Sequence, residues 1–466
     1  MENNSIIRLA DFVSGTNFED LPDEAIRFLK RHLLDTFGCA IAGVTSDKGK
    51  YGINFARSFH AGPAQATVLG YGDRLSAMGA AFVNAELING LDFDAAGLHL
   101  PPFVIPPALA AAQMNHRSGK DLITAVALAL EVGTRMSKGL IPEKLPGSGI
   151  NRVSGPSSSV FGGAAGVSKM EGFTRDQTAH ALGLVGVMST VNSQSAMHQD
   201  LPINSGKYLM AGWAAQTGLS APYLIKSGHR GDLKVLDNEI GYHLFAGWKQ
   251  WRPDIVFDGI GEQWRFLTIT PYKQFPACGM MSGGLEIVRE LVAENGIRPE
   301  EIEQIHTYLD PSSAEPMFHN RKVYNQIDMQ FSVPYNMAVC AYGIAPGVQW
   351  QNSQNLNNPV IRALMDKVVM DVHPECAAAQ QIDNRNRVIA VEITARGQVF
   401  RKERRFVKGT VTTGSVMHIS DEELIAKFRS NAEVLLPAYK IDQAVETMFR
   451  LEEMEDVNDV VKLFHV

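Results

Sequence analysis

Four ionisable side chains are the strongest candidates for chemistry in this sequence: Asp92, His99, His198 and Lys273. An imidazole or a carboxylate within hydrogen-bond reach of a substrate can remove a proton from it and return one. An ammonium group can hold a carboxylate and stabilise the negative charge that develops beside it. A site that combines these groups could move a proton at a carbon atom next to a carboxylate.

Each candidate also has an ordinary structural interpretation. Asp92 and Asp94 follow an Asn-Gly pair and could end a helix or solvate a turn. His99 lies in an apolar, proline-rich loop, where a lone histidine often packs and makes a single hydrogen bond. His198 lies between polar residues and could be a surface histidine, whereas Lys273 has few charged neighbours and could be an exposed lysine.

The sequence lacks the residue spacings that are usual in metal-binding and dinucleotide-binding proteins. The 13 histidines include no His-x-x-x-His or His-Glu-x-x-His arrangement, and His373–Cys376 is one isolated cluster. The glycines at Gly70–Gly72 and Gly162–Gly163 lack a preceding strand rich in valine or isoleucine and a ribose-binding acid. We therefore expect neither a metal nor another cofactor.

The composition excludes several partners. A formal net charge of −7 argues against a nucleic-acid surface, and the short basic run Arg401–Arg405 is interpreted as a solvated strand end or turn. Apolar segments such as Leu122–Val132 are too short to cross a bilayer, which needs about 20 residues. The four cysteines match no disulfide or zinc spacing, and the N-terminus has no secretion signal. These features favour a cytoplasmic protein with free thiols and no membrane contact.

Hydrophobic periodicity predicts a mostly α fold. A chain of 466 residues exceeds the roughly 250–300 residues that one core usually serves. Helical spacing dominates to about residue 250. The predicted helices are Asp23–Ala42, Ala77–Asn89, Pro106–Asn115, Gly119–Lys138, Ser159–Met170, Arg175–Val191 and Gly206–Leu219.

The pattern changes near Thr268–Pro276, where strands begin to mix with helices. Alternation predicts strands at Ile302–Leu309 and Val388–Ala395, while Gly283–Glu294 and Val333–Tyr342 read as helices. After Lys408 the chain returns to helical spacing. We therefore expect a large helical-bundle domain made of residues 1–269 and 409–466, interrupted by a smaller α+β lid domain at 270–408.

Five segments in order resemble the MmgE/PrpD family, which includes 2-methylcitrate dehydratase, cis-aconitate decarboxylase and iminodisuccinate epimerase. Two resemble signature helices, and three resemble segments of the family's second half. They are Leu34–Gly43, Ala80–Asp94, Tyr272–Cys278, Gln330–Tyr335 and Met417–Phe428. The resemblance spans nearly the whole chain and implies a helical domain with an α+β lid, in a protein that usually forms a homodimer.

The sequence departs from the family where dehydratases and decarboxylases carry their acids. After Asp94 the chain reads Ala-Ala-Gly instead of Asp-Thr, and a histidine of a His-Pro-x-Ser segment is missing before Pro156. His198 stands where a lysine is expected, and the histidine expected a few residues after Pro276 is also replaced. Removal of water or carbon dioxide requires an acid matched to the leaving group, and that equipment is altered here.

These departures favour epimerisation, which needs only removal and return of a proton. The hypothesis is an epimerase of a small dicarboxylate such as iminodisuccinate, catalysed by Asp92, His99, His198 and Lys273 in a cleft between bundle and lid. The resemblance adds Gln330, Tyr335 and Tyr272 as substrate-binding residues. The alternatives are a hydro-lyase or decarboxylase acting on a di- or tricarboxylate and, third, a binding protein without catalysis.

Overall fold

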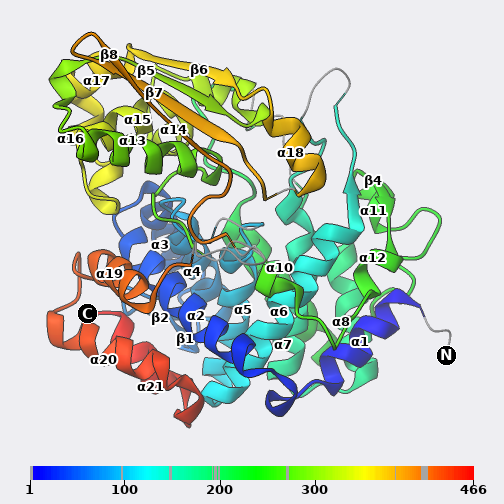
Figure 1. The fold of residues 1–466 in the computed structure, drawn as a ribbon. Coiled ribbons are helices and arrows are strands. Elements are labelled where there is room, and N and C mark those ends of the chain that lie inside the picture. Colours follow the sequence, from blue (N-terminus) through cyan, green and yellow to red (C-terminus); the bar gives the residue numbers. More distant parts are fainter. Residues whose placement is uncertain are drawn as a thin grey trace.

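The structure is a computed structural model that confirms the mostly α fold class. It describes residues 4–95, 98–145, 150–191, 193, 197, 200–268, 272–383, 385–410 and 418–466. Figure 1 shows the helices of the first half as one group, with a sheet and its helices above them. None of the helices in these ranges combines the length and the apolar composition that crossing a membrane requires.

The larger hydrophobic core joins helices from the two ends of the sequence. Three C-terminal helices, drawn in orange and red, pack beside the N-terminal half although they follow the sheet in the chain (Figure 1). The helices outside the sheet region are α1 (Ser5–Gly15), α2 (Asp23–Gly43), α3 (Asp47–Phe59), α4 (Ala77–Asn89), α5 (Pro101–Met114), α6 (Gly119–Gly139), α7 (Val160–Met170), α8 (Arg175–Val187), α10 (Ala211–Lys226), α11 (Tyr242–Phe245), α12 (Pro253–Phe257), α19 (Asp421–Ala432), α20 (Ala438–Phe449) and α21 (Val457–Val461).

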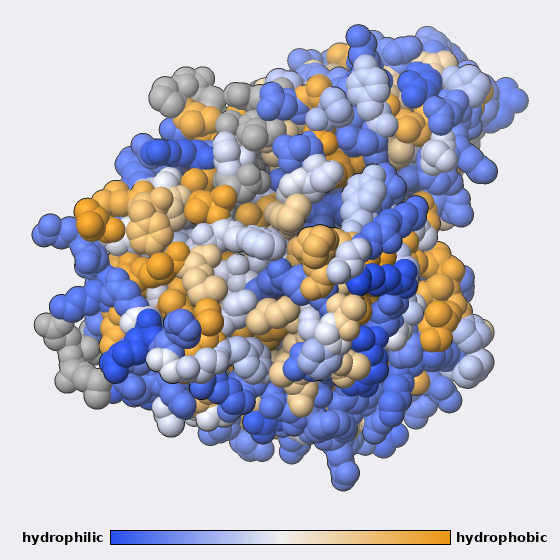
Figure 2. Space-filling model, turned by 180° about the vertical axis from the view of Figure 1, so that it is seen from behind, coloured by the Kyte–Doolittle hydropathy of each residue, from blue (hydrophilic) through white to orange (hydrophobic). Residues whose placement is uncertain are grey.

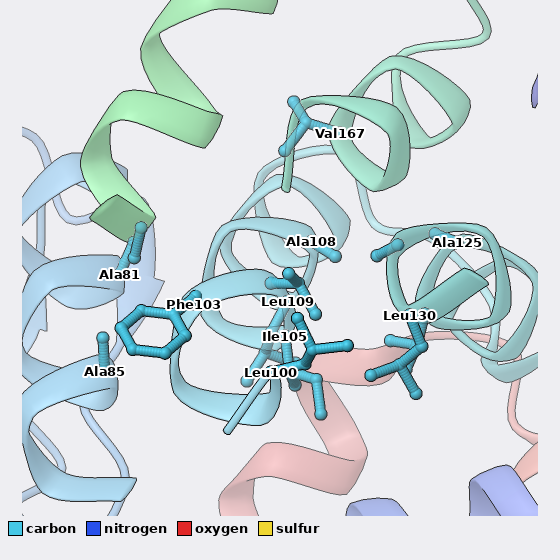
Figure 3. Close-up of a cluster of buried hydrophobic side chains, with 14 of the residues drawn as sticks. Ala81, Ala85, Leu100, Phe103, Ile105, Ala108, Leu109, Ala125, Leu130 and Val167 are labelled. Carbon is cyan, nitrogen blue, oxygen red and sulfur yellow. The ribbon is translucent and has the colours of Figure 1, made fainter. Parts of the chain in front are cut away.

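Small residues allow the central helices to approach closely, as the sequence predicts. A Cβ atom added to Gly162 of α7 would lie 2.3 Å from the carbonyl oxygen of Ala129 in α6. Figure 3 shows Ala108 of α5 facing Ala125 of α6, with larger apolar side chains filling the space beside them. Close packing of this kind fixes the end of α4 and the loop before α5, which carry the candidate site.

A second core lies under a four-stranded sheet. Its strand order is β6-β5-β7-β8, with β5 parallel to β6 and the other pairs antiparallel. Met197 and Ile203, which precede this region in the chain, also belong to this core. The region contains β5 (Ile302–Leu309), β6 (Val368–Val372), β7 (Ile389–Ala395), β8 (Gln398–Arg404), α13 (Ser282–Glu294), α14 (Gln326–Phe331), α15 (Val333–Ala341), α16 (Ser353–Asn357), α17 (Pro359–Met365) and α18 (Cys376–Ile382).

Two small strand pairs complete the described secondary structure. They are β1 (Ala66–Thr67) with β2 (Arg74–Leu75), and β3 (Leu140–Pro142) with β4 (Trp248–Trp251). The division into a bundle domain and an inserted lid domain stays a prediction.

Four predicted helix boundaries are wrong, among them the end of the helix predicted at Gly206–Leu219, which runs to Lys226. Helix α5 begins at Pro101 and contains Pro106 and Pro107 in its interior, because its first turns are buried in the bundle. Helix α8 ends at Val187 rather than at 191. The helix predicted at Gly206–Leu219 begins five residues later, since the preceding residues form a turn that positions the site.

Several helices begin with a residue whose side chain caps the first turn. Capping boxes form at Ser118, Thr174 and Ser420, where each side chain accepts a hydrogen bond from a backbone N–H of the first turn. The four cysteines are free thiols. Figure 2 shows that the face turned away from the view of Figure 1 is largely hydrophilic, with interspersed hydrophobic groups.

Candidate active site

The candidate site is built on the turn that follows α4. Twelve of the thirteen residues of α4 are buried, so the end of this helix is held inside the molecule. Asp92, three residues beyond it, has 0% exposure and adopts a φ of 53°. This left-handed conformation is rare for residues other than glycine, and it turns the chain sharply within the core.

Two lysines from separate parts of the chain form ion pairs with the carboxylate of Asp92. The ammonium group of Lys207 lies 2.8 Å from Oδ1, and that of Lys273 lies 2.9 Å from Oδ2. All three side chains are almost fully buried. Isolated charges are costly to bury, so the carboxylate and the ammonium groups stabilise one another.

The three groups differ in how they titrate. Burial alone would raise the pKa of Asp92, but the charges of Lys207, Lys273 and His99 hold that pKa below its usual range. Burial lowers the pKa of Lys207 to about 8, although Asp92 opposes the shift. Burial would also lower the pKa of Lys273, but Asp92 and Asp94 outweigh it and raise that pKa above its ordinary value. Lys207 can therefore exchange a proton near neutral pH, whereas Lys273 stays charged.

His99 lies beside the two aspartates. Its Nδ1 atom is 3.6 Å from Oδ2 of Asp94 and 4.0 Å from Oδ1 of Asp92. The imidazole stacks on the ring of Tyr208, with centroids 4.4 Å apart, and its side chain is 13% exposed. The hydroxyl group of Tyr208 points to Cys278, 3.7 Å from Sγ. His99 thus has buried acids on one side and solvent access on another.

Five consecutive backbone carbonyl groups at the end of α4 each accept a hydrogen bond from a distant side chain. Asn89 is the last residue of α4, and the other four carbonyl groups belong to the buried turn that follows the helix, where backbone acceptors need partners. The donors come from the turn before α10, from the sheet region and from α19. The pairs are Asn89 with Lys207 at 3.0 Å, Gly90 with Gln330 at 2.8 Å, Leu91 with Gln351 at 2.7 Å, Asp92 with Lys273 at 2.8 Å and Phe93 with Lys427 at 2.9 Å.

Unusual backbone conformations gather at the site. The described non-glycine residues with positive φ number six, and four of them are Asp92, Leu98, His99 and Lys207. Such conformations persist only where surrounding contacts enforce them, and they cluster at functional sites. The contacts around Asp92 are of this enforcing kind.

A cavity of about 1100 Å³ opens next to these groups, between the helical part and the sheet region. His99, Tyr208, Lys273 and Cys278 contribute to its wall. Among the described residues that line it, five are basic and two are acidic, which suits an anionic ligand. The basic residues are Lys138, Lys273, Arg385, Arg387 and Lys408.

The structure brings together Asp92, His99 and Lys273, three of the four residues predicted to be catalytic. The fourth, His198, lies outside the residues that the structure describes. Whether these residues act in catalysis stays a prediction.

The three residues predicted to bind substrate are placed differently. Tyr272 lines the cavity. Gln330 is fully buried and donates to Gly90, and the hydroxyl group of Tyr335 donates to the carbonyl oxygen of Trp350 at 2.7 Å. Neither Gln330 nor Tyr335 is among the described cavity-lining residues, so their contacts are those of side chains that hold the backbone.

Lys207, Tyr208 and Cys278 were not among the site residues predicted from the sequence. The periodicity placed Lys207 at the start of a helix, where a lysine is usually solvated, but the residue lies in a turn with a φ of 46° and 0% exposure. The Asn-Ser-Gly sequence just before it is typical of a turn and was the available signal. Nothing in the local pattern marks Tyr208 or Cys278.

The carboxylates and the imidazole could be considered as metal ligands, since atoms of Asp92, Asp94 and His99 lie within 4.8 Å of one another. However, each oxygen of Asp92 already faces an ammonium group within 2.9 Å. A divalent cation there would be repelled by both lysines. The donor set therefore fits the two lysines better than it fits a metal.

Comparisons with known proteins agree with this architecture. The MmgE/PrpD N-terminal domain matches residues 7–253, and the MmgE/PrpD C-terminal domain matches residues 275–451. The chain is 25% identical over 356 residues to a cis-aconitate decarboxylase of Aspergillus terreus, covering 71% of this chain and 70% of that protein. It is 24% identical to a cis-aconitate decarboxylase of Homo sapiens, covering 97% of this chain and 93% of that protein. It is 25% identical to a cis-aconitate decarboxylase of Mus musculus, covering 97% of this chain and 92% of that protein. The two matched domains together span most of the sequence, and the chain belongs to the MmgE/PrpD family.

Proposed function

We propose that this chain is a lyase that decarboxylates a small unsaturated tricarboxylic acid of the cis-aconitate type. The observation that carries the proposal is the position of His99, which lies at the wall of a basic cavity and beside Asp92 and its two lysines. This arrangement offers cations for the carboxylates and an imidazole for proton transfer in one place.

Loss of carbon dioxide breaks a carbon–carbon bond and leaves an electron pair on the substrate. Conjugation with a remaining carboxylate spreads this charge as an enediolate, which Lys273 can stabilise as a permanent cation. A proton delivered by the ring of His99 then completes the product. The tricarboxylate and one proton become carbon dioxide and an unsaturated dicarboxylate.

The names of the relatives support decarboxylation over the epimerase hypothesis. The relatives described above are named decarboxylases, so the lyase alternative has better support than an isomerase that acts on iminodisuccinate. The altered residues near Asp94 and Pro276 first favoured epimerisation because leaving-group acids are missing there. Contrary to the expectation from the sequence, loss of carbon dioxide needs no acid for its leaving group, because carbon dioxide departs without a proton. These departures therefore do not exclude decarboxylation.

The test is incubation of the purified protein with cis-aconitate, followed by NMR spectroscopy and carbon dioxide detection. We expect release of one carbon dioxide for each dicarboxylate formed. The His99→Gln variant should lose most of this activity, and a melting curve shows whether the variant remains folded. Parallel incubation with 2-methylcitrate measures loss of water.

Other outcomes assign other functions. Exchange of an α hydrogen in deuterium oxide, without carbon dioxide or a new alkene, would restore the epimerase hypothesis. Loss of water from 2-methylcitrate alone would identify a hydro-lyase. Binding of tricarboxylates without turnover would indicate a non-catalytic protein.

A further inference from the structure

A buried lysine outside the cavity has no part in the proposed reaction. Lys48, in the first turn of α3, is 3% exposed and is not among the described residues that line the cavity. Burial of an ammonium group is costly unless hydrogen bonds and an opposite charge compensate it. The contacts of Lys48 must therefore compensate the cost of burying its charge.

The contacts of Lys48 lead to the candidate site. Its ammonium group donates to Oδ1 of Asn89 at 2.8 Å and lies 3.3 Å from Oε2 of Glu86. The backbone carbonyl oxygen of Asn89 accepts a hydrogen bond from Lys207 at 3.0 Å. Lys207 in turn holds Asp92. A continuous chain of buried polar contacts thus joins α3 to the carboxylate at the centre of the site.

Glu86, the acid that is paired with Lys48, makes a second contact that holds the backbone. Oε1 of Glu86 accepts a hydrogen bond of 2.7 Å from the backbone N–H of Gly212, in the first turn of α10. The turn that carries Lys207 ends just before this helix. Glu86 therefore fixes the far end of that turn, while Asn89 fixes Lys207 itself.

We propose that Lys48 is a positioning residue for the candidate site, which holds Lys207 against Asp92 through Asn89 and places a second positive charge behind it. Its effect on turnover rests on the proposed function. Its effect on the protonation of Lys207 does not, and can be measured without a substrate.

The charges around Lys207 determine the direction of this effect. Asp92 and Asp94, in the turn after α4, favour the ammonium form of Lys207, whereas Lys48 and Lys273 disfavour it. Glu86 lies behind Lys48 and reduces the influence of that charge. Removal of Lys48 should therefore raise the pKa of Lys207. A role in packing alone predicts no such change.

The experiment measures the titration of Lys207 by NMR in protein labelled with ¹⁵N-lysine, assigned by loss of one signal in Lys207→Met. In Lys48→Met we expect the pKa of Lys207 to rise by about one unit, as when one nearby like charge is removed. Lys48→Arg, which keeps the charge, should restore the lower value. Lys30→Met is the matched control, because Lys30 is also largely buried and paired with an acid, Glu452 at 2.7 Å, away from the site.

A second variant protects the test against failure to fold. Lys48→Met leaves Glu86 buried without its cation, so Lys48→Met/Glu86→Gln provides a neutral pair of similar shape. A smaller rise in the pKa of Lys207 is expected in this protein. An unchanged pKa in either folded variant, or an equal rise in Lys30→Met, would overturn the proposal. If the protein decarboxylates its substrate, the alkaline limb of kcat/KM should move to higher pH in the same variants.

Discussion

The ring of Tyr208 lies flat against the imidazole of His99, with an interplanar angle of 29°. His99 and Leu98 both adopt positive φ angles, so their loop needs outside contacts to keep its shape. Tyr208 supplies such a contact from a turn more than one hundred residues away. The stack therefore sets the direction of the imidazole relative to Asp92 and Asp94.

The stack predicts different effects for two substitutions of Tyr208. Tyr208→Phe keeps the ring and should retain kcat within a few-fold, because the stack on His99 remains. Tyr208→Leu removes the ring, and misplacement of a catalytic group can cost on the order of 10²-fold in rate. Steady-state kinetics with cis-aconitate and a melting curve for each variant make the comparison. Equal activity of the two variants would show that the ring does not position His99.

Lys273→Met should reduce kcat/KM by on the order of 10²–10³, as for other groups that stabilise developing charge. It should also lower the melting temperature, because Asp92 would keep only one of its two cations. The sequence left open that this lysine is exposed, but a side chain that is 1% exposed and ion-paired is part of the core. Near-normal kinetics in a folded variant would exclude Lys273 from the site.

The pH profile should have an alkaline limb near pH 8. Below that value Lys207 is an ammonium group paired with Asp92 beside the cavity, and above it the group becomes neutral and the pair is lost. Lys273 has a raised pKa and adds no limb in this range. Measurement of kcat/KM from pH 6 to 10 tests this, with Lys207→Met as the control. If the alkaline limb of kcat/KM lies at the same pH in that variant, the titrating group is not Lys207.

The sequence predicted the fold class and most long helices because hydrophobic spacing and capping are local properties. Strands at 302–309 and near 389–395 were also found from alternation alone. Strand β6 was missed, since its pairing with β5 is decided by tertiary contacts. The basic run Arg401–Arg405 was interpreted as a solvated strand end or turn. Its first four residues form the end of strand β8, and Arg404 is paired with Glu286 and Glu290 of α13.

The candidate site was predictable only where a motif marked it. Asp92 and Lys273 stand in segments that resemble the family, and His99 follows one of these segments closely. Lys207 and Lys48 were not found, because a lysine is normally solvated and no local pattern shows that its ammonium group will meet a buried carboxylate. Such pairs depend on which distant turns the packing brings together.

The C-terminal helix α19 supplies the last of the five side chains that hold the turn after α4. Lys427 donates to the carbonyl oxygen of Phe93 at 2.9 Å and lies 2.7 Å from Oδ1 of Asp35 in α2. Burial raises the pKa of Asp35, and Lys427 only partly offsets this effect. A group whose pKa is higher in the folded protein than in the unfolded chain stabilises the fold at low pH. This contribution is lost as the pH rises from the pKa of the unfolded chain through the pKa of the folded protein.

Lys427→Met should therefore destabilise the protein by about 3–5 kcal/mol at pH 8, where Asp35 would be a buried charge without its partner. The loss should be smaller at pH 5, because protonation of Asp35 becomes easier once the lysine is gone. Chemical denaturation at both pH values measures the difference. Asp35→Asn/Lys427→Met removes both charges and should recover most of the stability, yet it should not recover activity, since the donor to Phe93 is still missing. Full activity in this double variant would show that α19 stabilises the fold without positioning Asp92.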